Sequence, residues 1–194
     1  VQRFAFAIKL SGFPANRVFG SGTVLDTARL KYNLGQHLDV DSRSVHAFII
    51  GEHGDSEIAA FSSANVSGIP LKQFCADNCG DICHADKMKE IAEDVKNSAY
   101  EIIKKKNATY YGIAMSVRRI CEAVVLDQKS ILPVSCIQTG QHGISNVALS
   151  MPAVVGENGV EEDVKVSLNA EEETAVKKSA EMLKNIISEL DLDY

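Results

Sequence analysis

Apolar side chains repeat at intervals of three and four residues in four stretches of the chain, which is the period of a helix with one buried face. In the first stretch the apolar positions are Leu25, Ala28 and Tyr32, and Thr23 precedes them where an N-cap residue belongs. The last stretch opens with Asn169 and a run of glutamates, whose charge favours a helix N-terminus. The predicted helices cover residues 23–37, 85–106, 110–126 and 169–190.

Short runs rich in β-branched and aromatic residues predict strands at 18–19, 44–50, 131–137 and 147–155. The last two runs are separated by turn residues at 139–143, which favours an antiparallel hairpin. Alternation of parallel strands with crossover helices is absent from the pattern, as are internal repeats. The expected class is therefore α+β, with antiparallel sheets packed against long helices.

The first residues of the chain are expected to belong to a larger structure. Residues 1–10 have the pattern of the end of an apolar-faced helix, and the Ser-Gly-Phe-Pro segment at 11–14 stops it. There is no initiator Met, and the apolar stretch near Arg3 is too short for a signal peptide. We expect 1–17 to join a further domain of a longer chain and 18–194 to form a separate domain.

Composition narrows the classes of function. Hydrophobic residues make up 45% of the 194 residues and charged residues 24%, which is ordinary for a globular chain with a core. A net charge of -6 disfavours nucleic acid as a partner, and no apolar run is long enough to span a membrane. Five cysteines are an odd number, so we expect reduced thiols and a cytoplasmic location rather than a secreted disulfide framework.

His53 is the first candidate for chemistry. It lies in the segment Gly-Glu-His-Gly-Asp-Ser at 51–56, directly after a predicted strand, with acidic residues on both sides. An imidazole in such a loop can exchange protons near neutral pH. On position alone, a solvated histidine held by Asp55 is the simpler interpretation.

Asp26 and Arg29 are three residues apart on a predicted helix, so their side chains share a face. The pair has two ordinary explanations: a salt bridge, or a capping box formed by Asp26 with Thr23. The functional alternative is that Arg29 holds a substrate carboxylate with its planar fork while Asp26 orients and stabilises a charged His53. Position alone leaves these explanations open.

Other motifs argue against competing chemistries. Ser56 invites comparison with hydrolases, but no G-x-S-x-G elbow occurs in the chain. Cys75, Cys79 and Cys83, followed by His84, recur at helical spacing, yet nearby turn residues favour cysteines that pack as small hydrophobes over a metal site. No G-x-G-x-x-G and no Walker loop is present, so the chain lacks the usual phosphate-binding loop of a dinucleotide site.

Four segments give the sequence a specific resemblance. It resembles the C-terminal part of NAD-dependent L-lactate dehydrogenases nearly end to end. The segments are SGFPANRVFGSGTVLDTARL at 11–30, VHAFIIGEHGDSE at 45–57, NATYYGIAMSV at 107–117 and ILPVS at 131–135. The resemblance implies the lactate dehydrogenase C-terminal fold, with NAD as cofactor and pyruvate or lactate as substrate, and it places the family's Rossmann half and the residue that best separates lactate from malate enzymes before Val1.

The resemblance also implies roles for individual residues. His53 matches the proton acceptor and donor, and Asp26 the carboxylate paired with it. Arg29 matches the arginine that binds the substrate carboxylate, and Thr109 a threonine of the pocket around the substrate side chain. Ser21 and Ile113 match positions that contact the nicotinamide end of NAD.

Regulation and assembly are implied in the same way. Many bacterial members bind fructose 1,6-bisphosphate between subunits through an arginine and a histidine, which correspond to Lys31 and His46. Lysine at the first of these positions predicts weakened or altered activation. The family further implies a cytoplasmic homotetramer. The competing hypotheses are a malate dehydrogenase within the same family and a non-catalytic oligomerisation module.

Overall fold

A computed structural model describes residues 7–8, 10–79 and 85–188 of the chain. The predicted helix at 1–10 falls mostly outside this range, and the described residues 7–8 and 10 are helical. Cys83 and His84, the last members of the cysteine stripe, also lie outside the described residues.

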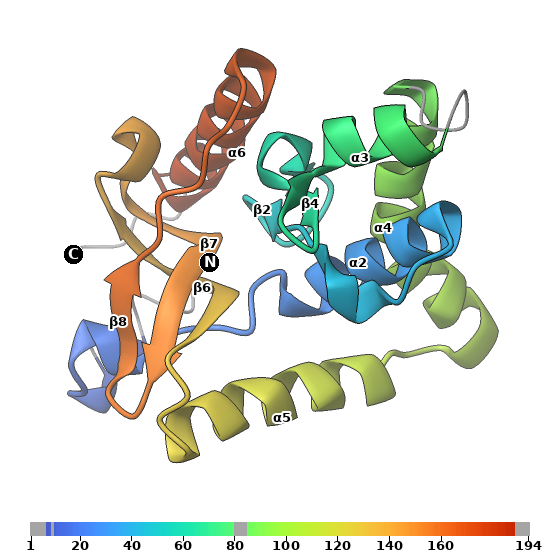
Figure 1. Cartoon of the computed structure of the whole chain (residues 1–194). Helices are drawn as coiled ribbons and strands as arrows, with labels where there is room; N and C mark the ends of the chain where they lie inside the picture. The colour runs from blue at the N-terminus through green and yellow to red at the C-terminus, as the bar shows by residue number, and fades with distance from the viewer. Residues whose placement is uncertain (1–6, 9, 80–84, 189–194) are drawn as a thin grey trace.

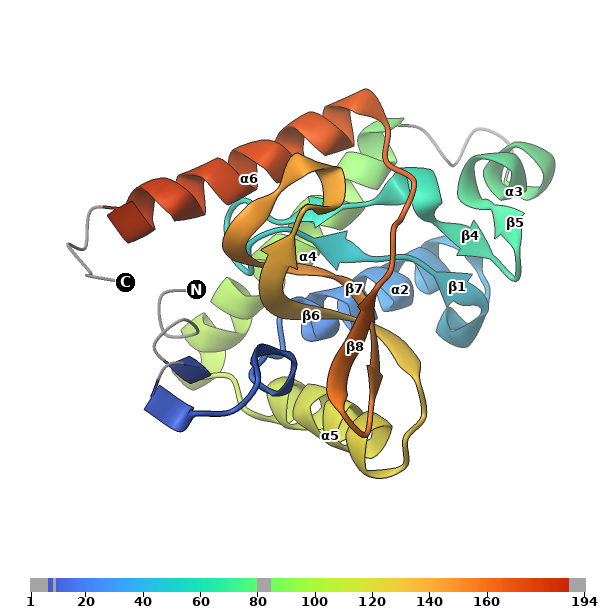
Figure 2. The same cartoon turned by 90° about the vertical axis from the view of Figure 1, so that its left-hand side faces the viewer.

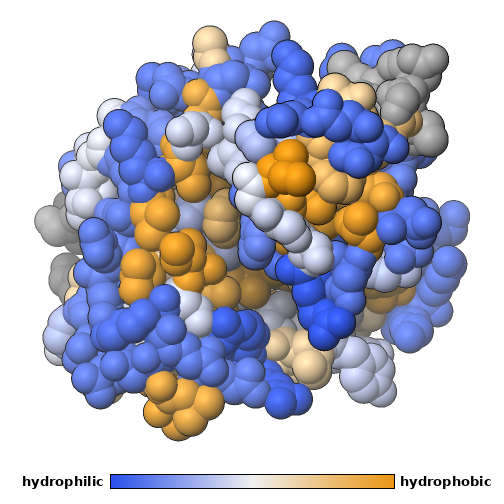
Figure 3. All heavy atoms as spheres, viewed as in Figure 1, coloured by the Kyte–Doolittle hydropathy of each residue, from blue (hydrophilic) through white to orange (hydrophobic). Residues whose placement is uncertain are grey.

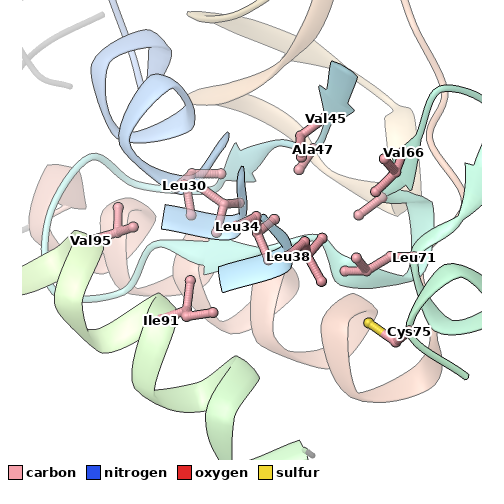
Figure 4. Close-up of a cluster of buried hydrophobic side chains, with 12 residues drawn as sticks. Leu30, Leu34, Leu38, Val45, Ala47, Val66, Leu71, Cys75, Ile91 and Val95 are labelled. Atoms are coloured by element: carbon pink, nitrogen blue, oxygen red, sulfur yellow. The ribbon is translucent and has the colours of Figure 1, made fainter. Parts of the chain in front are cut away.

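The helix α2 (Val24–Leu38) lies at the centre of the molecule (Figure 1). It contacts α4 (Ala85–Lys106) and α5 (Tyr111–Val125), and it also contacts the strands β1 (Val45–His46) and β2 (Ile49–Ile50). Its apolar face packs into a buried cluster with α3 (Leu71–Asn78) and α4, whose members include Leu30, Leu34 and Ile91 (Figure 4). The predicted helices are confirmed, with α4 covering the predicted range and α6 spanning Ala170–Ser188. Among the described residues, no helix has the length and apolar character needed to cross a bilayer.

One antiparallel sheet holds the second half of the fold together. Its strands β6 (Ser130–Thr139), β7 (Ser145–Gly156) and β8 (Gly159–Asp163) lie side by side in that order. The predicted hairpin is thereby confirmed, with both strands longer than expected. Figure 2 shows α6 along one edge of the molecule, α5 along the opposite edge and this sheet between them. Apolar side chains of the sheet pack against α6 toward the start of β7 and against Val24 and α5 toward its end.

The remaining strands are short, and the single strand predicted at 44–50 is wrong. The chain there forms β1 and β2, which pair with different partners: β1 with β4 (Asn65–Val66) and β2 with β3 (Ile58–Ala59). Strand β4 turns into β5 (Ile69–Pro70) through Ser67 and Gly68, which both have positive φ. The strand predicted at 18–19 is also absent from this region; Gly20 forms only an isolated bridge with Ser135.

Two local expectations need correction. Thr23 precedes α2 but makes no capping hydrogen bond, and the capping box is instead built at the start of α6, where Asn169 and Glu172 each accept a hydrogen bond from the backbone N–H of the other. Cys75 is disulfide-bonded, while Cys79, Cys121 and Cys136 are free. An odd number of cysteines excludes complete pairing but still permits one disulfide, so the expectation of uniformly reduced thiols was too broad.

The surface is hydrophilic over most of the face in Figure 3, with apolar side chains gathered in two areas. One lies where α6 meets the β6–β7–β8 sheet and the other lies over α3 and its neighbouring strands. Large apolar side chains are also exposed on α5 and directly after it, among them Tyr111, Met115 and Val125.

Candidate functional site

The site is built where α2 meets β2. Thr23 and Thr27 are one helical turn apart and both are buried. The hydroxyl of Thr23 donates to the carbonyl of Ile49 at 2.5 Å, and the hydroxyl of Thr27 accepts from the N–H of Ile49 at 2.8 Å. Two buried hydrogen bonds to one strand residue fix the register of α2 against β2. The loop that follows β2 therefore emerges at a defined position beside the N-terminal half of α2.

This loop, at 51–57, is held by three other elements. Gly51 exchanges backbone hydrogen bonds of 2.9 Å with Ser150 of β7. Ser179 of α6 accepts from the backbone N–H of Glu52 and shares a 2.9 Å hydrogen bond with the hydroxyl of Ser56. The hydroxyl of Tyr100 on α4 donates to Asp55 at 3.0 Å. Asp55 thus anchors the loop to a helix and is not the partner of His53.

Gly51 is required at its position for two reasons. Its φ of 96° lies in the region that disfavours side chains, and a Cβ atom there would stand 2.7 Å from Ile58 Cδ1. The sharp change of direction that it allows sends the chain from β2 to His53.

His53, Asp26 and Arg29 form a continuous charged set. The His53 Nδ1 atom lies 2.7 Å from Oδ2 of Asp26, and Nη1 of Arg29 lies 3.1 Å from Oδ1 of the same carboxylate. The side chain of Asp26 is 4% exposed and that of His53 is 56% exposed, so the pair joins a buried charge to an accessible ring. Oδ2 accepts no hydrogen bond of good geometry from the described residues, and we describe its contact with His53 as an ion pair. The capping-box explanation of Asp26 is therefore wrong.

The neighbouring carboxylate changes the acid/base behaviour of His53. The short contact with Asp26 and the negative charge of that carboxylate raise the pKa of His53, against the opposing effects of burial and of Arg29. The ring nitrogen Nε2 is left for contact with another molecule. This arrangement is suited to an imidazole that gains and loses a proton near neutral pH while its other nitrogen stays oriented.

Glu57 is a member of the site that the sequence did not single out. Burial, followed by the negative charge of Asp26, raises the pKa of Glu57 to about 7. It follows His53 by four residues in a loop, where sequence spacing implies no common face, and only the fold shows that it turns back toward Asp26.

Asp26, His53 and Glu57 each offer one potential metal-binding atom, and these atoms lie within 4.8 Å of one another. The 2.7 Å contact between His53 and Asp26 is shorter than the separation of two ligands that each sit ~2.0 to 2.2 Å from a tetrahedral ion. A cation would have to break that pair next to the positive charge of Arg29. The geometry is that of an ion-paired proton-transfer site, and we assign no metal to it.

Two cavities border the charged set. His53 and Ser21 line a cavity of about 490 Å³ together with Gly20, Gly22 and Ser135. Arg29 and Thr109 line a separate cavity of about 130 Å³ together with Leu25 and Gly112. Asp26 contacts His53 of the first cavity and Arg29 of the second, and so links the two. Ile113 is partly exposed in the first turn of α5 and lines neither cavity.

Lys31 and His46 meet in a third cleft, of about 340 Å³, between α2, β1 and β6. Burial lowers the pKa of Lys31. Arg119 of α5 lines the same cleft and donates to Ser130 at 2.7 Å, a basic residue that the sequence pattern did not connect with the other two. The predicted pair is thus brought together with a third basic side chain.

Comparisons with known proteins agree on one family. The profile of the lactate/malate dehydrogenase, alpha/beta C-terminal domain, matches residues 23–191. An L-lactate dehydrogenase of Acetivibrio thermocellus is 54% identical over 184 residues, and one of Clostridium perfringens is 50% identical over 185 residues; each match covers 95% of this chain and 58% of the relative. Among solved structures, the minor L-lactate dehydrogenase from Enterococcus mundtii in its ligands-bound form superimposes with a TM-score of 0.92 at 38% identity, over 99% of this chain and 60% of that one.

Proposed function

Because this chain belongs to the lactate/malate dehydrogenase family, as its alpha/beta C-terminal domain, we propose that it supplies the proton-transfer and substrate-binding half of an NAD-dependent L-lactate dehydrogenase. The observation that carries the proposal is the continuous set of His53, Asp26 and Arg29. The two curated relatives that are 54% and 50% identical to this chain are both named L-lactate dehydrogenases. Their names support lactate over malate as the substrate. The chain spans 58% of their length, so the activity of the whole protein is part of the proposal.

His53 is assigned to proton transfer. Its Nδ1 atom faces Asp26, so Nε2 takes the hydroxyl proton of lactate as the alcohol carbon is oxidised, and returns it to the carbonyl oxygen in the reverse direction. The Asp26 carboxylate stabilises the imidazolium that forms, and its burial keeps this charge close to the ring and away from solvent. When bound, NAD supplies the acceptor and donor of the hydride.

Arg29 is assigned to the substrate carboxylate. It makes one hydrogen bond, from Nη1 to Asp26, among the described residues, which leaves the rest of its guanidinium for a second anion. Its side chain is 17% exposed and lines the small cavity with Thr109. Thr109 lines the same cavity as Arg29, which places it beside a carboxylate held by that arginine and supports its proposed role.

The described residues suit the nicotinamide end of NAD and not its phosphates. Ser21 borders the larger cavity beside the exposed ring of His53, between Gly20 and Gly22, and apolar side chains of α6 line the same cavity. Ile113 is the second proposed contact. The absence of a glycine-rich phosphate loop from the sequence means that the remainder of NAD would be bound by residues outside this chain.

Replacing the histidine tests the proposal. In the natural full-length protein, His53→Ala should lower the rate of pyruvate reduction by roughly 10²- to 10⁴-fold, the usual contribution of general acid/base catalysis. His142→Ala is the matched control, since it removes the histidine of another glycine-flanked loop. Steady-state rates on pyruvate and on oxaloacetate decide the substrate. Wild-type turnover in His53→Ala would contradict the proposed function and favour a non-catalytic module.

The cleft with Lys31 and His46 supports a further part of the proposal, an anionic activator of the sugar-bisphosphate class bound between subunits of a homotetramer. Three basic side chains at one cleft provide the charge. Titration of the full-length enzyme with fructose 1,6-bisphosphate should lower KM for pyruvate, and Lys31→Ala should remove the effect. Identical kinetics across the titration would exclude activation.

A further inference from the structure

We propose that Glu57 is a positioning residue of this site: a second carboxyl beside the His53–Asp26 pair whose charge sets the pH range in which His53 gains and loses its proton. The kinetic consequence rests on the proposed function, whereas the coupling itself is a property of the folded chain.

Geometry places Glu57 within the pair's immediate surroundings. One carboxylate oxygen of Glu57, one of Asp26 and a ring nitrogen of His53 all lie within 4.8 Å of one another. The Oε1 atom of Glu57 is buried and accepts no hydrogen bond from the described residues. The backbone of Glu57 is held by a 3.2 Å hydrogen bond from its N–H to Gly54, inside the anchored loop. A buried, unpaired carboxylate oxygen is costly when ionised, so the protonated form is favoured here.

The charges that face Glu57 come from every neighbouring element. Asp26 and Arg29 project from α2, His53 from the same loop, and Lys96 from α4. Lys96 forms its ion pair with the exposed Glu93, at 3.8 Å, and acts on Glu57 only through its charge. Burial and Asp26 oppose ionisation of Glu57, while His53, Lys96 and Arg29 favour it.

The two carboxyls have different environments. Among the described residues, Asp26 is ion-paired with both Arg29 and His53, whereas Glu57 is in no ion pair and its buried Oε1 accepts no hydrogen bond. Because two negative charges at this distance oppose one another, Glu57 is the carboxyl that takes up a proton, with a pKa of about 7. His53 and Glu57 then titrate as interacting groups rather than independently.

The charge of Glu57 acts on the pKa of His53 in a definite direction. An ionised Glu57 raises the pKa of His53, so it helps the imidazole to keep its proton as the pH rises. In Glu57→Gln this help is lost, and His53 should lose its proton at lower pH. Reduction of pyruvate, which needs the imidazolium, should then decline at lower pH than in the wild type. Oxidation of lactate, which needs the neutral ring, should persist to lower pH.

The deciding experiment is an NMR titration of His53 in the natural full-length protein, with its signal assigned by its loss in His53→Gln. The wild type should give a broad titration with a second inflection near the Glu57 pKa of about 7. Glu57→Gln should give a single step displaced to lower pH, and Glu57→Asp should partly restore the wild-type curve. Glu93→Gln, which removes an exposed carboxylate beside Lys96, should leave the curve unchanged.

The outcomes separate this inference from the proposed function. An unchanged His53 titration in a folded Glu57→Gln protein would overturn the coupling, whatever the enzyme does. A displaced titration in a protein without dehydrogenase activity would support the coupling and contradict the function. In an active enzyme, the kcat/KM profiles for the two directions should shift together toward lower pH. A uniform loss of rate with unmoved profiles would assign Glu57 to structure alone.

Discussion

Two loops of this chain carry nearly the same four residues, Gly-Glu-His-Gly at 51–54 and Gly-Gln-His-Gly at 140–143, yet their histidines have opposite surroundings. The ring of His53 is 56% exposed and lies 2.7 Å from the buried Asp26. The side chain of His142 is 3% exposed and its Nδ1 lies 3.5 Å from Glu173, which is itself 44% exposed. The loop pattern is common to both; what differs is the helix that each loop faces. The proposed proton transfer rests on a buried carboxylate beside an accessible ring, and at His142 and Glu173 these exposures are reversed.

The sharpest test of this contrast removes the carboxylate from each loop. Asp26→Asn should lower turnover of the full-length enzyme by roughly 10²- to 10⁴-fold, because His53 loses the charge that stabilises its protonated form. Glu173→Gln should leave turnover near the wild-type value. Steady-state kinetics measure both. Similar losses in the two variants would mean that burial of the partner is not what distinguishes the loops.

Stability should respond in the reverse order. His142→Ala removes a buried ring and should lower the free energy of unfolding by about 1 to 3 kcal/mol. His53→Ala removes a ring that is mostly exposed and should change it by less than ~1 kcal/mol. Urea unfolding of the two variants, followed by circular dichroism, compares them directly. A larger loss in His53→Ala would show that the His53 loop depends on its ion pair for folding.

The free energy of unfolding should also depend on pH. Glu57 has its ordinary pKa of 4.5 in the unfolded chain and a pKa of about 7 in the folded chain, so the folded chain binds the proton more tightly. The free energy of unfolding should therefore fall as the pH rises from 4.5 to about 7. The raised pKa of His53 adds a further decline above 6.5. Glu57→Gln should flatten the first decline, while Glu93→Gln should retain it. Melting temperatures recorded across this range provide the measurement; equal slopes in all three proteins would argue against a perturbed Glu57.

The sequence predicts this fold well where a single period persists over many residues. The ranges of α4, α5 and α6 follow from their apolar spacing, and the hairpin of β6 and β7 from two long runs around glycines. The prediction of one strand at 44–50 is wrong because the apolar run is continuous in sequence while its pairing partner changes. Its first part, β1, pairs with β4, and its second part, β2, pairs with β3. Strand β8 was missed because three of its five residues are acidic and because it pairs along one edge of the sheet.

The site, too, has one part that sequence spacing predicts and another that depends on distant contacts. Asp26 and Arg29 share a helix face and their pairing was foreseeable, as was an accessible imidazole between glycines. That His53 reaches Asp26 rather than Asp55 depends on contacts far apart in sequence, which spacing does not encode. Thr23 illustrates this point: it has the right identity and position for a cap, but its hydroxyl is drawn to Ile49 on a strand formed 26 residues later. Glu57 and Arg119 were missed for the same reason.

The double hydrogen bond from Thr23 and Thr27 to Ile49 has a consequence for moving this chemistry elsewhere. Successive residues of a helix are rotated by about 100°, so one residue inserted between Asp26 and Thr27 would turn Thr23 and Asp26 away from the face that carries Thr27. The two hydrogen bonds to Ile49 could then no longer form together and fix the direction of the carboxylate. A graft of residues 51–57 onto another scaffold would carry the histidine without its partner. A graft that keeps the pair intact would have to include α2, β2 and the loop at 51–57 together.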